Sequence, residues 1–153
     1  MSSTVHTFMQ MNFKLFIENN NQKDVEKTIS KLPKAHKKLI SDYKLNFHPN
    51  NTLDGDSKNV GVINTKNKKI TVASPWNYGR EFTFLHEVAH LVWDHLLSKS
   101  QKDEWSTVVK KNKKRNKKES DEELFCMAYA NHYANNKIVI HTNDDWSDFI
   151  KSV

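Results

Sequence analysis

The sequence has few of the residues that define several common classes of protein. Its 153 residues include one cysteine, three glycines and three prolines. A single cysteine, Cys126, cannot form an internal disulfide, and it rules out zinc ribbons and fingers built on cysteine. The scarcity of glycine and proline argues against collagen-like or low-complexity chains. The length suits one domain, 1–153, in which the polar residues 1–21 are expected to be loosely ordered.

Long apolar runs are also missing from the chain. No run approaches the ~18 residues that a membrane-spanning helix needs, and no secretory signal is visible at the start. We therefore expect a monomer of the cytoplasm or another intracellular compartment, with no membrane partner. The sequence leaves the source open, a virus or phage included.

Arginine is scarce although the chain is basic. Lys and Arg number 24 against 18 Asp and Glu, a formal net charge of +6, yet only Arg80 and Arg115 are arginines. Seven basic residues fall in the run 110–118, namely Lys110, Lys111, Lys113, Lys114, Arg115, Lys117 and Lys118. Such a run is typical either of a solvated loop or of a patch that binds nucleic acid or another polyanion. No aromatic residue interrupts it, so we expect no stacking platform for single-stranded bases.

Hydrophobic periodicity predicts an α+β fold. Helices are expected at 24–32, 33–44, 80–98, 101–109, 120–135 and, as a short amphipathic turn, at 146–150, and strands at 43–48, 60–63, 70–73 and 138–140. The strands should form a small mixed or antiparallel sheet in which 60–63 and 70–73 pair as a hairpin. The strand near 69–74 is expected at an exposed edge, where an extended substrate could pair with it.

The most informative segment is His86-Glu87-Val88-Ala89-His90, inside the helix expected at 80–98. Two histidines four residues apart lie on one helix face, so both imidazoles can reach one metal ion. The apolar positions of this helix form a separate stripe toward the core, made of Phe82, Leu85, Ala89, Val92 and Leu96. Glu87 is placed beside such a metal, where it can take a proton from a metal-bound water and return it to a leaving amine.

A catalytic zinc has three protein ligands and one open position. We expect the third ligand from the helix at 120–135, where Glu123 leads an apolar run and would point inward. In an alternative register, Glu119 is the ligand and Glu123 supports it. Asp94 is too far along its helix to bind the same ion, so it is interpreted as a solvated charge or a supporting carboxylate. Cys126 is interpreted as a small buried thiol.

The segments FLHEVAHLVW and EELFCMAYA together resemble the gluzincin metallopeptidases. Among these, they most resemble the catalytic domain of the anthrax lethal factor and Pro-Pro endopeptidase group, over about residues 70–135. The resemblance implies a zincin-like fold and an endopeptidase acting on a protein or peptide. It also implies that His86, His90 and Glu123 bind Zn2+ and that Glu87 is the general base.

The chain departs from this group at two positions. The group carries a tyrosine about two turns before its glutamate ligand, which helps to stabilise the oxyanion, and here that position is Asn116. The oxyanion donor is therefore open, and Tyr78 is a candidate because it precedes the active helix. A carboxylate often follows the ligand glutamate by four residues in the group, and here that position is Met127.

Three other functions remain open at this point. DNA-associated metallopeptidases of the SprT kind also carry HExxH, although their third ligand is normally a histidine. Metallopeptidases that cleave phage repressors share HExxH and a downstream glutamate. A non-catalytic protein that binds polyanions through the run 110–118 would belong to a different class. The preferred prediction is a zinc-dependent endopeptidase.

Overall fold

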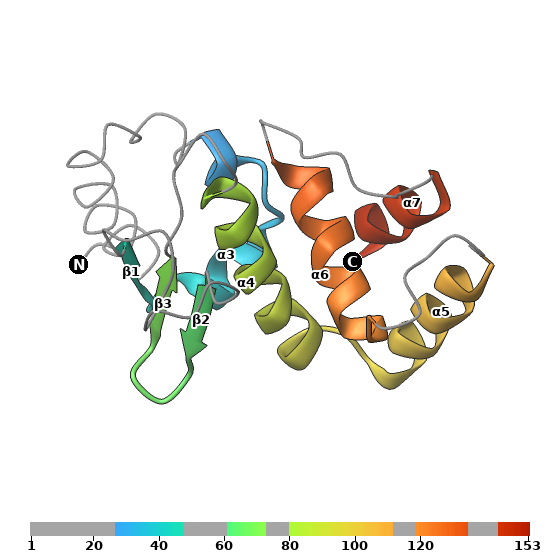
Figure 1. Cartoon of the computed structure of the whole chain (residues 1–153), viewed down its shortest axis with the longest axis horizontal. Coiled ribbons are helices and arrows are strands. Elements are labelled where there is room, and N and C mark those ends of the chain that lie inside the picture. Colours follow the sequence, from blue (N-terminus) through green and yellow to red (C-terminus); the bar gives the residue numbers. More distant parts are fainter. Residues whose placement is uncertain (1–26, 48–60, 73–79, 112–118, 135–143) are drawn as a thin grey trace.

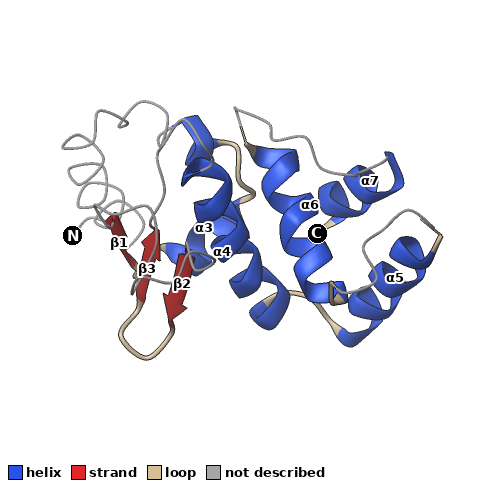
Figure 2. Ribbon diagram, viewed as in Figure 1, coloured by secondary structure: helices blue, strands red, loops and turns tan. Residues whose placement is uncertain are grey.

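The computed structural model describes residues 27–47, 61–72, 80–111, 119–134 and 144–153. They form a small sheet at one end of the molecule and a larger set of helices beside it (Figures 1 and 2). Several sequence-based predictions lie outside the described residues, namely the loose segment 1–21, Tyr78, the strand at 138–140, and Lys113, Lys114, Arg115, Lys117 and Lys118. The fold is α+β, as predicted.

The first described helices end earlier than the sequence predicts. A helical turn at 27–30 ends before Pro33, because proline has no backbone N–H to continue a helix. Helix α3 (Lys34–Ile40) then stops at Ile40, so the predicted helix at 33–44 is too long. Between residues 41 and 45, buried and exposed residues alternate with the period of two that is typical of a strand. Strand β1 (Lys44–Phe47) follows directly.

The sheet has three strands in the order β1-β3-β2. Strands β2 (Gly61–Asn64) and β3 (Lys69–Val72) form the predicted hairpin, with Gly61 opposite Val72. Strand β1 pairs with β3 in parallel, so the sheet is mixed. The predicted edge position of the strand near 69–74 is wrong, because β3 is the central strand and Ile70 is fully buried. Within the described residues, β2 is an edge strand.

Helix α4 (Arg80–His95) carries the HExxH segment and lies between the sheet and the remaining helices (Figure 1). Three members of its predicted core stripe, Leu85, Ala89 and Val92, are completely buried. Leu96 is 37% exposed, contrary to the prediction, and Leu97 is buried instead. The reason is that the helix ends at His95, so the helical spacing no longer applies to the two leucines.

Three further helices complete the described fold. Helix α5 (Lys99–Lys110) begins with a capping box, in which the side chains of Ser98 and Gln101 each accept a hydrogen bond from the other residue's backbone N–H. Helix α6 (Asp121–Tyr133) and helix α7 (Asp144–Ser152) correspond to the segments predicted at 120–135 and 146–150. No helix among the described residues combines the length and the apolar character needed to cross a bilayer.

An aromatic cluster holds α6 in place relative to α5 and α7. The ring centroid of Trp105 lies 5.8 Å from that of Phe125, 5.3 Å from that of Trp146 and 5.1 Å from that of Phe149. All four residues are buried. Aromatic pairs at such separations stabilise packing beyond the burial of their area. Since α6 also packs against α4, this cluster fixes the position of α6 beside the HExxH helix.

A buried polar pair joins α3 to α6. The Nδ1 atom of His36 and the hydroxyl of Tyr129 lie 2.8 Å apart, and both side chains are buried. Burial lowers the pKa of His36, so the imidazole is held neutral and can share one hydrogen with the hydroxyl. The pair therefore connects the N-terminal part of the fold to the glutamate-bearing helix without burying a charge.

Candidate metal centre

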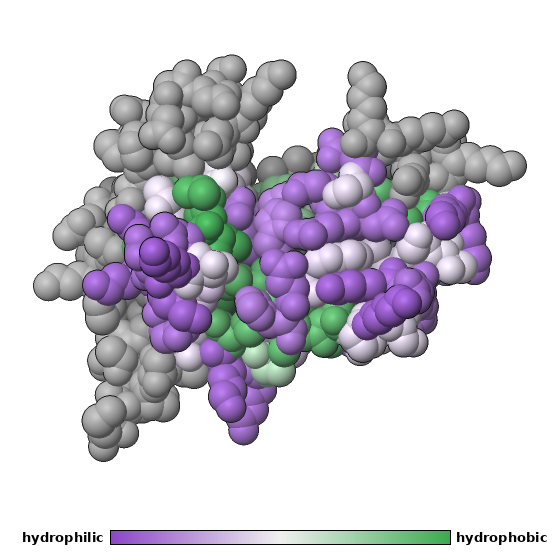
Figure 3. Space-filling model, turned by 90° about the horizontal axis from the view of Figure 1, so that it is seen from below, coloured by the Kyte–Doolittle hydropathy of each residue, from purple (hydrophilic) through white to green (hydrophobic). Residues whose placement is uncertain are grey.

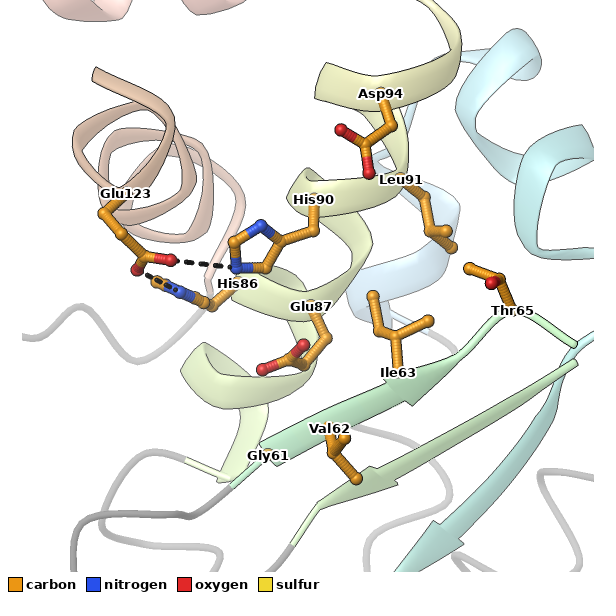
Figure 4. Close-up of a pocket in the computed structure, with 10 residues that line it drawn as sticks. All are labelled: Gly61, Val62, Ile63, Thr65, His86, Glu87, His90, Leu91, Asp94 and Glu123. Carbon is orange, nitrogen blue, oxygen red and sulfur yellow. Dashed lines mark ion pairs between the residues drawn. The ribbon is translucent and has the colours of Figure 1, made fainter. Parts of the chain in front are cut away.

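Helices α4 and α6 bring His86, His90 and Glu123 together (Figure 4). Nε2 of His86 lies 3.0 Å from Oε2 of Glu123, and Nε2 of His90 lies 3.2 Å from Oε1 of the same carboxylate. Ligand atoms about 2.0–2.1 Å from a tetrahedral zinc ion are separated from one another by about 3.3 Å. The two separations in the structure are close to that value. One ion placed between these atoms could therefore contact all three side chains.

Local structure explains why Glu123 faces the histidines. The hydroxyl of Ser120 accepts a hydrogen bond from the backbone N–H of Glu123, which fixes the start of α6 and places Glu123 in its first turn. A carboxylate is favoured there by the helix dipole. Glu119 precedes this cap, and the described residues show no ion pair between Glu119 and either histidine. The geometry favours Glu123 over the alternative register.

Glu122 orients His90, a role that the sequence pattern does not predict. Nδ1 of His90 lies 2.6 Å from Oε2 of Glu122, a hydrogen-bonding distance at which the ring N–H donates to the carboxylate. Metal-binding histidines usually donate their second N–H in this way, which leaves the other nitrogen free to coordinate. The supporting carboxylate is therefore Glu122, one residue before Glu123. The resemblance implies such a carboxylate four residues after Glu123, where this chain has Met127. Its only sequence signal is its place beside Glu123 in an acidic first turn.

Cys126 is a second candidate for the third ligand, and the sequence pattern does not indicate it. It is completely buried, as predicted, but one ligand atom each from His86, His90 and Cys126 lie within 4.8 Å of one another. Cys126 follows Glu123 by three residues, so both lie on the same face of α6. Burial raises the pKa of the thiol well above its usual value, and the carboxylates of Glu123 and Glu122 add to the rise. Glu123 is preferred because its two oxygens lie 3.0 Å and 3.2 Å from the two Nε2 atoms, near the separation expected in a tetrahedral zinc site.

Glu87 lies beside the candidate metal site. Its side chain is buried, and this burial raises its pKa to about 7. The electrostatic interaction with His90 opposes this rise in pKa, and the interaction with Glu123 adds to it. A carboxylate with a pKa near neutrality is well suited to accept and return a proton. Burial also lowers the pKa of His86, which favours the neutral imidazole that a metal requires.

These side chains open into a pocket of about 420 Å³ between α4 and β2 (Figure 4). The described residues that line it are Gly61, Val62, Ile63, Thr65, His86, Glu87, His90, Leu91, Asp94 and Glu123. Seen from below, hydrophobic residues gather where the sheet meets the helices, with hydrophilic residues on either side (Figure 3). The pocket therefore combines a polar wall on α4 and α6 with a strand edge that an extended chain could approach.

Gly61 is required where β2 comes closest to Glu87. A Cβ atom at this position would lie 2.7 Å from Oε1 of Glu87 and 2.8 Å from Cγ2 of Thr83. Gly61→Ala should therefore displace the Glu87 carboxylate and lower kcat/KM for any reaction in which Glu87 transfers a proton by about 10- to 100-fold. Zinc content, measured by mass spectrometry, should stay that of the wild type. The matched control is Lys66→Ala, at an exposed position of the same hairpin. Unchanged kcat/KM in Gly61→Ala would contradict the placement of Glu87.

Other basic and histidine residues lie away from this site. Of the basic run, Lys110 and Lys111 are described and exposed, at the end of α5, which Figure 1 shows across the molecule from β2. His95 is exposed at the end of α4, and Nδ1 of His132 lies 3.3 Å from the Ser147 hydroxyl of α7. Within the described residues, neither histidine joins the cluster around His86 and His90.

Comparison of the chain with protein-family models, curated proteins and solved structures finds no match in any of the three. The function of the site is therefore inferred from its own side chains and their geometry.

Proposed function

We propose that the protein is a zinc-dependent endopeptidase of the gluzincin type, with a zincin-like arrangement of sheet and active helix. His86, His90 and Glu123 are the zinc ligands in this proposal. The observation that carries it is the position of the Glu123 carboxylate, 3.0 Å and 3.2 Å from the Nε2 atoms of the two HExxH histidines. Two imidazole nitrogens and one carboxylate oxygen are a typical donor set for a catalytic zinc.

The chemistry follows from the residues around this donor set. Zinc, when bound, would supply Lewis acidity toward a peptide carbonyl and a water molecule. Glu87 accepts a proton from the attacking water and later delivers it to the amine that leaves. Its pKa of about 7 suits this exchange at neutral pH, because the group can both take up and release the proton. Tyr78 remains the proposed oxyanion donor from sequence alone.

Strand β2 offers the place where an extended substrate would bind. It is an edge strand among the described residues and lines the pocket with Gly61, Val62 and Ile63. The unpaired backbone groups of an edge strand can form hydrogen bonds with an added peptide strand. A peptide bound there would cross the pocket beside Glu87. The sequence predicts that a substrate pairs with the strand near 69–74. We propose β2 for this pairing instead, because β3 is the central strand.

Removal of zinc tests the proposal. Treatment with a chelator should abolish hydrolysis of a proteome-derived peptide library, and stoichiometric zinc should restore it. Magnesium and calcium should fail to restore it, because these hard ions prefer sites made of oxygen ligands. The readout is peptide cleavage followed by mass spectrometry. Cleavage that survives complete removal of the metal would exclude the proposed function, and so would a zinc-loaded protein without any hydrolysis.

The described residues give no separate support to a SprT-like or polyanion-binding protein, whereas the same ligand set also fits the metallopeptidases that cleave phage repressors. A SprT-like site needs a third histidine, and neither His95 nor His132 approaches the pair in the described fold. Most of the basic run lies outside the described residues, so a polyanion site has no structural support of its own. A protein or peptide substrate, a monomeric state and an intracellular location remain part of the proposal.

A further inference from the structure

The pocket extends beyond the candidate zinc ligands and Glu87 to a third acidic group, Asp94 (Figure 4). Asp94 follows Glu87 by two helical turns on α4, a distance of about 10 Å along the axis at 1.5 Å per residue. Leu91 lies between Glu87 and Asp94 on α4 and lines the pocket. The hairpin residue Thr65 lines the pocket from the side of the sheet. The side chain of Asp94 is exposed, and it forms no ion pair with any described residue. A charged group of a ligand could therefore reach it.

Strand β2 and helix α4 flank the pocket along this whole length. Gly61 lies against Glu87 at one end, and Thr65 lies toward Asp94 at the other (Figure 4). An extended peptide advances about 3.3 Å per residue. The distance from Glu87 to Asp94 therefore corresponds to about three residues of a peptide that runs along β2.

The charges in the pocket leave Asp94 uncompensated. With zinc bound, the two positive charges of the ion would offset the carboxylates of Glu87 and Glu123. The described lining contains no lysine or arginine, so nothing in it offsets the Asp94 carboxylate. A negative charge at the far end of the pocket attracts a cation, although the chain as a whole carries a net charge of +6.

We propose that Asp94 selects substrates with a lysine or arginine about three residues from the scissile bond. This inference rests on the proposed function and adds the chemical class of the substrate. A long basic side chain would lay its aliphatic part along Ile63, which is partly exposed, and place its charge beside the Asp94 carboxylate. Asp94 acts on binding alone, because it lies too far from Glu87 to touch the reacting atoms.

Cleavage specificity tests the inference. The probe is a library of proteome peptides released by a glutamate-specific protease, so that lysine and arginine remain within the peptides. We expect basic residues to be enriched by about two- to fivefold at one position about three residues from the cut, the range for an exposed ion pair. Asp94→Lys should shift this preference to aspartate, which also remains within these peptides. Asp103→Lys, which changes an exposed aspartate of α5, should keep the wild-type preference. Identical profiles for the wild type and Asp94→Lys would overturn the inference.

A binding measurement separates this inference from the proposed function. The probes are two peptide hydroxamates that chelate zinc and differ only in a lysine or a glutamate at the selected position. The zinc-loaded wild type should bind the lysine probe more tightly, and the difference should shrink as salt is added. Asp94→Lys should reverse the order. Equal affinities would overturn the inference and leave the peptidase proposal intact. Loss of both hydroxamate binding and cleavage would contradict the peptidase proposal itself.

Discussion

Replacement of Glu87 by glutamine is expected to abolish peptide hydrolysis while zinc stays bound. Glutamine has nearly the same shape, so it should fit beside Gly61, but it cannot accept a proton from water. General acid–base catalysis contributes about 10²- to 10⁴-fold, so we expect kcat/KM to fall by about that factor. The measurements are kcat/KM on a cleaved library peptide and zinc content by mass spectrometry. Because Glu87 is not a ligand in the proposal, the zinc content should equal that of the wild type.

A matched control makes this experiment specific. Glu104→Gln changes an exposed glutamate of α5 and should retain wild-type activity. If Glu87→Gln keeps kcat/KM within about threefold of the wild type, a difference of less than ~1 kcal/mol, Glu87 is not the general base. If Glu87→Gln loses zinc instead, the residue is a ligand, and the assigned roles in the site are wrong.

Replacement of Glu123 by alanine is expected to cause the largest loss of zinc affinity. The change removes the carboxylate whose two oxygens contact the two histidines in the described site. Loss of a supporting carboxylate typically weakens metal binding by about 10- to 100-fold, so Glu122→Gln should fall in that range. Glu123→Ala should exceed it, because it removes a ligand itself. Zinc competition titrations with a fluorescent chelator measure both variants.

Cys126→Ala decides between the two candidates for the third ligand. Its zinc affinity should stay near that of the wild type, because the carboxylate of Glu123 occupies the position better than the thiol. The opposite pattern, with zinc lost in Cys126→Ala and kept in Glu123→Ala, would assign the position to sulfur. Thermal unfolding of each zinc-free variant shows whether the substitution disturbed the fold, since Cys126 is completely buried.

Much of the site could be predicted because its signals are local. The spacing of His86 and His90 fixes their common face on any helix, whatever packs around them. The apolar run after Glu123 predicts an inward-facing side chain; in the structure this side chain is 39% exposed, and its carboxylate lies against both histidines. The hairpin of β2 and β3 was predicted for the same reason, since its strands are neighbours in the sequence.

What could not be predicted depends on contacts between distant segments. The parallel pairing of β1 with β3 makes β3 central and leaves β2 beside the pocket, and no local pattern encodes that order. The role of Glu122 depends on how α6 is rotated against α4, which the aromatic cluster around Trp105 helps to fix. The proximity of Cys126 to the histidines depends on the same rotation.

X-ray absorption at the zinc edge of the zinc-loaded protein tests the central claim most directly. Two histidines and Glu123 predict a shell of nitrogen and oxygen atoms at about 2.0–2.1 Å, with the scattering pattern of imidazole and no sulfur. A sulfur atom at about 2.3 Å would show that Cys126 holds the metal and would contradict the proposed ligand set. A protein that retains no zinc after loading would contradict the claim that this site binds a metal.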